Sequence, residues 1–331
     1  MANGEWSSES AEHPVLLGVD GGGTYTRVVC TDLVGHILAQ AQRGGANPSK
    51  NADAEQNVQG ALVEALEKAN CAPAQIAGLV AGIAGLDEAA DMEWAERFTT
   101  LAGMSGKPVC VNDAVIAWAG ALGLQPGIIV IAGTGCILFG VTENGRQIRN
   151  YDFHHYANAT ARDLTFKAVF RFLAGEDQEA DQPLVAQLLK HFGVENRRAL
   201  ALHAAQNDLR DRRELMRLYG DAAPLITQAA EQGFPLATTV CDQAARELTQ
   251  GVRLLGSLFE RDSVPCALIG SVAQSTPIRE RLTTTLTTSH NHRYQVRTAL
   301  LPPEAGAILL ARQQLGKPVT PELIANLQIL S

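Results

Sequence analysis

Two short glycine-rich turns, about 110 residues apart, constrain the fold of this chain more than any other feature. The first is Asp20-Gly21-Gly22-Gly23-Thr24 and the second is Ala132-Gly133-Thr134-Gly135-Cys136, each between two apolar runs. An apolar run, a glycine turn and a second apolar run indicate a β-hairpin. Because further strand and helix patterns follow each hairpin, the chain is predicted to contain two similar α/β halves.

Apolar periodicity indicates the order of elements in each half. In the first half, strands are predicted at 15–20, 27–32, 34–39, 76–85 and 108–113, and helices at 52–70, 88–103 and 114–122. This order is β-β-β-α-β-α-β-α. In the second half, strands are predicted at 127–132, 137–141, 264–269 and 294–298, with a long helical stretch at 162–258 and helices at 276–288 and 303–315.

The length of 331 residues is comfortable for two domains. We expect a first lobe at residues 14–118, joined by the C-terminal helix 303–316. We expect a second lobe at residues 119–302, with a helical insertion at 162–258. Residues 1–13 are polar and are expected to form a disordered tail.

Charge and cysteine content exclude several classes of protein. The net charge of −8 argues against a nucleic-acid-binding face, which needs to be basic. The six cysteines form no Cys-x-x-Cys pair, so free thiols in a reducing compartment are expected. Neither a signal peptide nor an apolar run of membrane-spanning length is recognised. We therefore expect a cytoplasmic protein with no nucleic-acid or membrane partner.

Both glycine turns are candidate phosphate sites. Glycine permits positive φ and close approach to a ligand, and successive backbone amides in such a turn bind phosphate oxygens. Thr24 adds a hydroxyl donor, and Asp20 is positioned to hold Mg²⁺ through water. Each turn alone is also consistent with an ordinary tight hairpin. Their pairing, one in each half, favours phosphate binding.

Two further strand ends carry candidate site residues. Asp113 follows a strand and precedes a helix, where an acid can accept the proton of an attacking hydroxyl. An Asp at this place is also a common helix cap. The strand that ends at Gly270-Ser271-Val272 allows a nucleoside to lie against the backbone, although an ordinary strand-to-helix turn has the same pattern.

The order of these motifs resembles the actin/hexokinase/Hsp70 ATPase superfamily. Gly82-Ile83-Ala84-Gly85, Asn112-Asp113-Ala114 and Pro302-Pro303-Glu304-Ala305-Gly306-Ala307 resemble the BadF/BadG/BcrA/BcrD ATPase family in particular. That family contains N-acetylglucosamine and glucosamine kinases. The resemblance, over residues 14–315, implies a two-lobed ribonuclease H-like (actin-like ATPase) fold. Its core is a duplicated βββαβαβα unit, with a nucleotide cleft between the lobes.

The resemblance also implies roles for individual residues. Asp113 would be the catalytic base and would contact the sugar together with Asn47, and Asp20 would hold Mg²⁺ through water. The final helix would pack back on the first lobe. ATP and a small sugar would be the substrates, and related kinases suggest a homodimer. The implied ATP-binding residues are Gly21, Gly22, Gly23, Thr24, Gly133, Thr134 and Gly135 for the phosphates, and Gly270, Ser271 and Val272 for adenosine.

Residues 150–161 depart from the family. The family's Asp-Glu-Gly-Ser-Gly segment, which supplies a sugar-binding acid, is here Ala157-Asn158-Ala159-Thr160-Ala161, and Cys136 replaces a usual Ser. Asp152 is a candidate replacement for the missing acid. His154 and His155 are expected to face opposite sides of a strand, one toward a pocket and one toward solvent, so they are not expected to chelate one metal.

Three functions remain open from the sequence. The first is transfer of phosphate from MgATP to a hydroxyl of an amino sugar. The second is a nucleotide-binding sensor or non-catalytic homologue with a degenerate sugar site, suggested by residues 150–161. The third is an ATPase that activates a CoA-ester dehydratase, which ranks low because the cysteines are not arranged to hold an iron–sulfur cluster.

Overall fold

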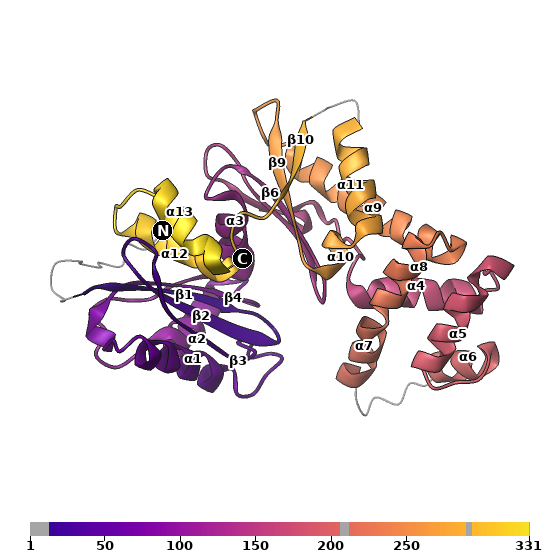
Figure 1. The fold of residues 1–331 in the computed structure, drawn as a ribbon, viewed down its shortest axis with the longest axis horizontal. Helices are drawn as coiled ribbons and strands as arrows, with labels where there is room; N and C mark the ends of the chain where they lie inside the picture. Colours follow the sequence, from indigo (N-terminus) through magenta and orange to yellow (C-terminus); the bar gives the residue numbers. More distant parts are fainter. Residues whose placement is uncertain (1–12, 206–211, 289–292, 331) are drawn as a thin grey trace. The chain divides into compact units, whose positions relative to one another are not determined.

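The computed structural model describes residues 13–205, 212–288 and 293–330 (Figure 1). The chain divides into two compact units. Unit 1 comprises Met1–Gln125 and Thr298–Ser331, and unit 2 comprises Pro126–Arg297. The expected tail at 1–13 lies almost entirely outside the described residues, as do residues 206–211 of the helical stretch predicted at 162–258.

Unit 1 contains a five-stranded sheet in the order β3-β2-β1-β4-β5. Its strands are β1 (Val15–Gly21), β2 (Tyr25–Asp32), β3 (Ile37–Gly44), β4 (Ile76–Ile83) and β5 (Val109–Asn112). Its helices are α1 (Ala54–Lys68), α2 (Met92–Thr99), α3 (Asp113–Leu122), α12 (Pro303–Gln314) and α13 (Pro321–Leu327), with short 3₁₀ turns η1 (Pro73–Gln75), η2 (Ala89–Asp91) and η6 (Gln328–Leu330).

Unit 2 contains a second sheet in the order β10-β9-β6-β7-β8. Its strands are β6 (Gly127–Ala132), β7 (Cys136–Val141), β8 (Gln147–Arg149), β9 (Val264–Ile269) and β10 (Tyr294–Thr298). Its helices are α4 (Ala161–Leu173), α5 (Gln182–His191), α6 (Arg197–Ala205), α7 (Arg212–Asp221), α8 (Ala223–Glu231), α9 (Pro235–Gly256), α10 (Ser271–Gln274) and α11 (Thr276–Thr288), with η3 (Asn150–Phe153) and η4 (Glu179–Asp181).

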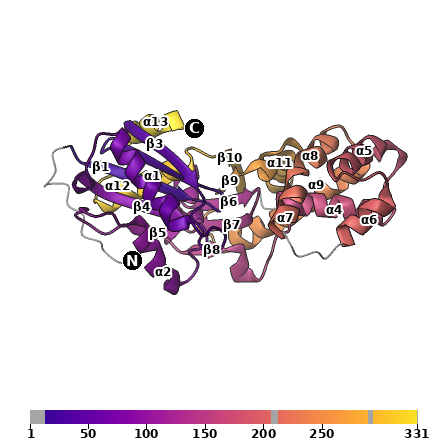
Figure 2. The same ribbon diagram turned by 90° about the horizontal axis from the view of Figure 1, so that it is seen from below.

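The two sheets repeat one topology. β1 pairs antiparallel with β2 and parallel with β4, and β6 pairs antiparallel with β7 and parallel with β9. The predicted duplication is therefore confirmed. Unit 2 differs by the helices α4–α9, inserted between its third and fourth strands, which gather beside its sheet (Figures 1 and 2).

Both faces of the unit 1 sheet are covered, which explains why its central strands are almost wholly apolar. β4 is buried along its entire length. From β1, Leu17 packs in one core with residues of α1 and α2, whereas Leu16 packs in a second core with residues of α3, α12 and α13. Helix α12 thus covers one face of the sheet of unit 1.

None of the helices in the described ranges is both long enough and apolar enough to span a membrane.

Some element boundaries differ from those predicted. The third strand begins at Ile37 instead of residue 34, because Gly35 has a φ of +90° and turns the chain first. Helix α13 was not predicted. It begins at the cap Thr320, whose hydroxyl accepts a hydrogen bond from the backbone N of Leu323 at 3.2 Å.

Helix α12 packs against α3 at Gly306, and this contact gives a first testable prediction. A Cβ at Gly306 would overlap the backbone carbonyl of Ile116 and the backbone N of Gly120. Gly306→Ala should therefore reduce the free energy of unfolding by about 2–3 kcal/mol, measured by urea denaturation. The matched control is Gly220→Ala, a helical position with open space around it, which should be neutral or slightly stabilising. Equal stabilities of the two variants would contradict this account.

Candidate functional site

The first glycine turn closes the β1–β2 hairpin of unit 1. The backbone N of Gly22 donates to the carbonyl O of Tyr25 at 2.9 Å. Gly23 and Thr24 form an exposed corner, whereas Gly21 is buried. Of the residues predicted to bind phosphate in this turn, Gly23 and Thr24 are therefore the ones exposed to solvent.

The reason for the glycines differs from the one predicted. Gly21, Gly22 and Gly23 are all described, and none has a positive φ. Close packing requires glycine at Gly21, where a Cβ would lie 2.8 Å from the Cβ of Ala46, and at Gly45, where a Cβ would overlap the carbonyl O of Gly23. The turn is therefore held against the loop after β3.

Asp20 lies at the end of β1 and forms an ion pair with Arg27 at 3.3 Å. Burial is the largest cause that raises its pKa, to about 7, followed by the negative charges of Glu304 and Asp113. Arg27 opposes this rise. Arg27 also lowers the pKa of Glu304, so one guanidinium group serves both Asp20 and Glu304.

Asp113 is the first residue of α3, but it is not the helix cap. Asn112 is the cap, and its Oδ1 accepts a hydrogen bond from the backbone N of Ala114 at 3.0 Å. Burial, and to a lesser degree the charge of Asp87, raises the pKa of Asp113, whereas the Ala114 backbone N–H and the Lys50 ammonium lower it. The capping alternative for Asp113 is therefore wrong, because its neighbour performs that role.

The predicted sugar residue Asn47 is 7 % exposed and lies against the turn after β4. A Cβ at Gly85 would lie 2.5 Å from Asn47 Nδ2, so only glycine fits there, and Gly85 also has a φ of +88°. In the same turn, Asp87 accepts a hydrogen bond from Asn112 Nδ2 at 3.1 Å. The turn thus joins Asn47 to the strand end that carries the predicted base.

Lys50 lies beside the first glycine turn. A Cβ at Gly23 would be 3.6 Å from both Cδ and Nζ of Lys50. The ammonium also lies near enough to Asp113 to lower the pKa of that carboxyl group. A cation therefore stands between the predicted phosphate turn and the predicted base.

The carboxyl groups of Asp20, Asp113 and Glu304 suit a hard cation such as Mg²⁺. Burial raises the pKa of each group, so all three lack full compensation of their charge. Among the described residues, no three His, Cys, Asp or Glu side chains are close enough to hold a metal ion by themselves. The donor set fits an ion that keeps water and nucleotide phosphates as ligands.

The second glycine turn is fixed from both sides in unit 2. The backbone N of Gly133 donates to the carbonyl O of Gly135 at 2.9 Å, and the carbonyl O of Gly133 accepts from the backbone N of Ala161 at 2.7 Å. Thr134 and Gly135 are exposed. Burial raises the pKa of the Cys136 thiol to about 12, so the residue after the turn is an uncharged thiol.

The predicted adenosine segment lies next to this turn. Gly270 has a φ of +92°, and a Cβ there would lie 2.5 Å from the carbonyl O of Ala132. A Cβ at Gly133 would lie 3.7 Å from the backbone N of Ser271. Ser271 is exposed and the Val272 side chain is buried. Unit 2 therefore brings its two predicted nucleotide segments together.

The segment after β8 is not a strand, so the prediction that His154 and His155 alternate on one is wrong. Asp152 caps the turn η3, accepting a hydrogen bond from the backbone N of Arg149 at 2.8 Å. His154 is exposed with a φ of +53°, whereas His155 is half-buried against Gly251 of α9. The buried Nδ1 of His155 has no hydrogen-bond partner among the described residues.

Residues 157–161 form the capped start of α4. The Thr160 hydroxyl accepts from the backbone N of Asp163 at 3.2 Å, and Asp163 accepts from the backbone N of Thr160 at 3.0 Å. Glu247 of α9 accepts from the backbone N of Asn158 at 2.7 Å and pairs with Lys167 at 2.9 Å. A carboxylate thus lies beside the segment that lacks the expected acid, but it is paired with Lys167.

Sequence reasoning missed the charged residues that surround the predicted site. Only Glu304 belongs to a segment that carried the family resemblance, and the others stand outside any motif. The missed residues are Arg27, Lys50, Asp87, Glu247 and Glu304.

Comparisons with known proteins agree with this arrangement. The sequence profile of the BadF/BadG/BcrA/BcrD ATPase family matches residues 17–311. An N-acetylmuramic acid/N-acetylglucosamine kinase of Clostridium acetobutylicum is 26 % identical over 243 residues, covering 72 % of this chain and 78 % of that protein. A glucosamine kinase of Vibrio cholerae is 25 % identical over 262 residues, covering 78 % and 85 % respectively.

A solved structure supports the same fold. It is the crystal structure of a protein from Chromobacterium violaceum that is named as an N-acetylglucosamine kinase. Its TM-score is 0.69 at 26 % identity, and the match covers 90 % of this chain and 99 % of that one. This likeness and the duplicated five-stranded sheets confirm the predicted two-lobed, actin-like ATPase fold.

Proposed function

Because the chain belongs to the BadF/BadG/BcrA/BcrD ATPase family, we propose that it transfers the γ-phosphoryl group of ATP to a hydroxyl of an amino sugar. Two relatives named as kinases of amino sugars support this substrate class. The proposal rests on the carboxyl group of Asp113 at the start of α3. Asn112, and not Asp113, is the N-cap of this helix.

In the proposed reaction, Asp113 accepts the proton of the sugar hydroxyl while the new O–P bond forms. The bond between the γ-phosphorus and its bridging oxygen breaks, and ADP leaves. Burial, which raises the pKa of Asp113, brings this base nearer to the pH at which a proton transfer is most effective. Asn47, beside the same corner, would orient the sugar.

The remaining roles concern the phosphates. The amides of the turns at Gly21–Thr24 and Gly133–Gly135 would bind phosphate oxygens, and Gly270–Val272 would lie along the adenosine. Mg²⁺, when bound near Asp20, would neutralise charge on the phosphates. Lys50 would add a protein cation beside the first turn.

The experiment that tests the function is a coupled assay of ADP release. A panel of glucosamine, N-acetylglucosamine, N-acetylmuramic acid and glucose is supplied with MgATP. We expect turnover with at least one amino sugar and much slower turnover with glucose. If glucose is the best acceptor, the proposed substrate class is wrong.

Lys50→Met should raise the KM for ATP about tenfold, because it removes a charged group from beside the phosphate turn. Steady-state kinetics at saturating sugar measures this change. The matched control is Lys107→Met, an exposed lysine of the same unit. A KM unchanged in both variants would contradict the role of Lys50.

A second function follows from the start of α4. There the expected acid is absent and the nearby Glu247 is paired with Lys167. A sensor of nucleotide with a degenerate sugar site would show an ATP-induced increase in Tm without ADP release on any sugar. That result would favour the sensor over the kinase.

A further inference from the structure

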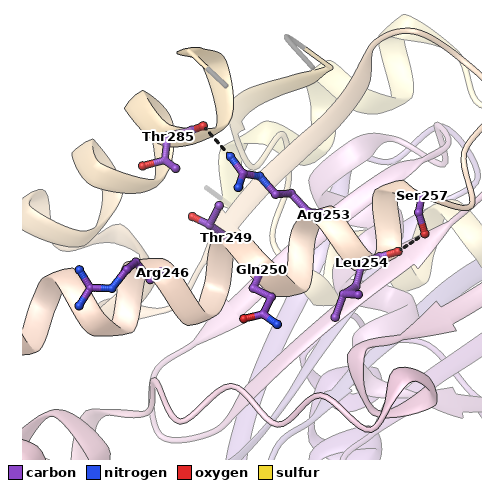
Figure 3. Close-up of a pocket in the computed structure, with 7 residues that line it drawn as sticks. All are labelled: Arg246, Thr249, Gln250, Arg253, Leu254, Ser257 and Thr285. Atoms are coloured by element: carbon purple, nitrogen blue, oxygen red, sulfur yellow. Dashed lines mark hydrogen bonds between the residues drawn. The ribbon is translucent and has the colours of Figure 1, made fainter. Parts of the chain in front are cut away.

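A groove of about 470 Å³ lies between helices α9 and α11 of unit 2 (Figure 3). Its volume is in the range of small-molecule sites. Thr285 stands nine residues after the first residue of α11, which is roughly 13 Å along the helix axis. The groove is therefore separate from the adenosine segment that precedes α11. Its lining residues are Arg246, Thr249, Gln250, Arg253, Leu254, Ser257 and Thr285.

The groove is positively charged. Arg246 and Arg253 are two helical turns apart on one face of α9, and none of the described lining residues is acidic. Asp242, the carboxylate one turn before Arg246, is paired with Arg281. In Figure 3, Arg246 makes no hydrogen bond to the other residues drawn. Among the residues that the structure describes, neither Arg246 nor Arg253 forms an ion pair with a carboxylate.

Three hydroxyl groups complete the lining. Ser257 donates to the carbonyl O of Leu254 and Thr285 donates to that of Arg281, both at 2.7 Å, so the oxygens of both hydroxyls remain free to accept. Thr249 is 4 % exposed, and its hydroxyl has no hydrogen-bond partner among the described residues. A buried polar group without a partner is rare in native proteins, and this one lines the groove.

Arg253 makes one weak hydrogen bond that a ligand could replace. Its guanidinium donates to the carbonyl O of Thr285 at 3.4 Å, at the long limit of a hydrogen bond (Figure 3). Such a contact is given up easily.

We propose that this groove binds a phosphorylated sugar. The two arginines would bind the phosphate, as guanidinium groups commonly do. The hydroxyl oxygens of Ser257 and Thr285 would accept hydrogen bonds from sugar hydroxyls, and Thr249 would gain its missing partner. The site lies outside the proposed catalytic residues, and its occupation does not depend on turnover.

Isothermal titration calorimetry of the whole protein at constant ionic strength tests this proposal. The three probes are glucosamine 6-phosphate, inorganic phosphate and glucosamine. We expect glucosamine 6-phosphate to bind at least tenfold more tightly than either of the others, because only it satisfies both arginines and hydroxyls. Equal affinity for inorganic phosphate would overturn the sugar phosphate assignment.

Substitutions then locate the binding. Arg246→Gln and Arg253→Gln should each raise the Kd of glucosamine 6-phosphate about tenfold, because each removes a charge-assisted hydrogen bond. Arg198→Gln, at an exposed position on α6, is the control and should leave the Kd unchanged. An unchanged Kd in both groove variants would place the binding elsewhere and overturn the proposal.

Thr249→Val separates ligand binding from folding. It should leave Tm unchanged or raise it, because it removes an unpaired buried hydroxyl, yet it should weaken binding about fivefold. Thr165→Val is the matched control, since the Thr165 hydroxyl of α4 is also buried without a partner among the described residues. It should not alter the Kd. If both variants bind with the wild-type Kd, Thr249 is not a ligand contact and the proposal fails.

Discussion

Asp113→Asn is expected to reduce sugar-dependent turnover about 10³-fold, in line with the contribution of a general base. Asn keeps the shape of the side chain but cannot accept the proton of the attacking hydroxyl. The affinity for ATP should change little, because the phosphate turns stay intact. Coupled kinetics measures the turnover, and calorimetry with a non-hydrolysable ATP analogue measures the affinity.

Asn112→Ala is the informative control for this variant. Asn112 caps α3, so its loss should reduce the free energy of unfolding by about 1 kcal/mol. The base itself remains, so most of the turnover should survive well below Tm. If Asp113→Asn retains turnover within tenfold of the wild type, or if Asn112→Ala loses as much turnover as it does, Asp113 is not the base.

The fold was predictable because its central strands are buried on both faces. Such strands are short apolar runs, and the runs at β1, β4, β6 and β9 were all recognised. Their glycine turns indicated the duplication. Helix α13 was missed although the cap Thr320 and the following Pro321 are a local helix-start signal. Its residues Leu323 and Leu327 pack in the core shared with α12.

The candidate site residues that follow strand ends could be predicted from the sequence. β1, β4 and β5 run parallel, so Asp20, Gly85 and Asp113 lie at the same end of the sheet. The surrounding charges were not predictable. Lys50 reaches the glycine turn from a loop after β3, and Glu304 arrives from the other end of the chain. Only tertiary packing brings them there.

In residues 150–161 the sequence lacks the sugar-binding acid that the family resemblance led us to expect. The structure shows what part of the replacing segment does instead. Thr160 and Asp163 cap α4 reciprocally, which stabilises the helix start. The alternation expected for the two histidines failed because the chain turns at η3 before it reaches them.

Asp20→Asn is expected to stabilise the ligand-free protein at neutral and higher pH while impairing catalysis. Burial and the charges of Glu304 and Asp113 raise the pKa of Asp20 from 3.8 to about 7. Between these two values the unfolded chain releases this proton and the folded chain retains it. The free energy of unfolding therefore falls as pH rises through this window, by about 4 kcal/mol at most.

The Asn side chain does not titrate, so the free energy of unfolding of the variant should not show this decrease between pH 4 and pH 7. Its stability relative to the wild type should be unchanged near pH 4 and higher at pH 8, as measured by urea denaturation at both values. The exposed Asp262 supplies the control, since Asp262→Asn should alter stability little at either pH. A destabilised Asp20→Asn variant at pH 8 would contradict the account.

The same substitution should lower kcat/KM at saturating Mg²⁺ by about 10²-fold or more, because Asp20 is the proposed holder of the ion. Gain of stability and loss of activity in one variant would distinguish a functional carboxylate from a structural one. A structural carboxylate paired with Arg27 would lose stability on substitution at pH 8, since Arg27 would be left without its partner. The sign of the change in the free energy of unfolding at pH 8 therefore decides between two roles for the cluster of Asp20, Asp113 and Glu304. A gain indicates a role in nucleotide binding, and a loss indicates a role in stabilising the fold.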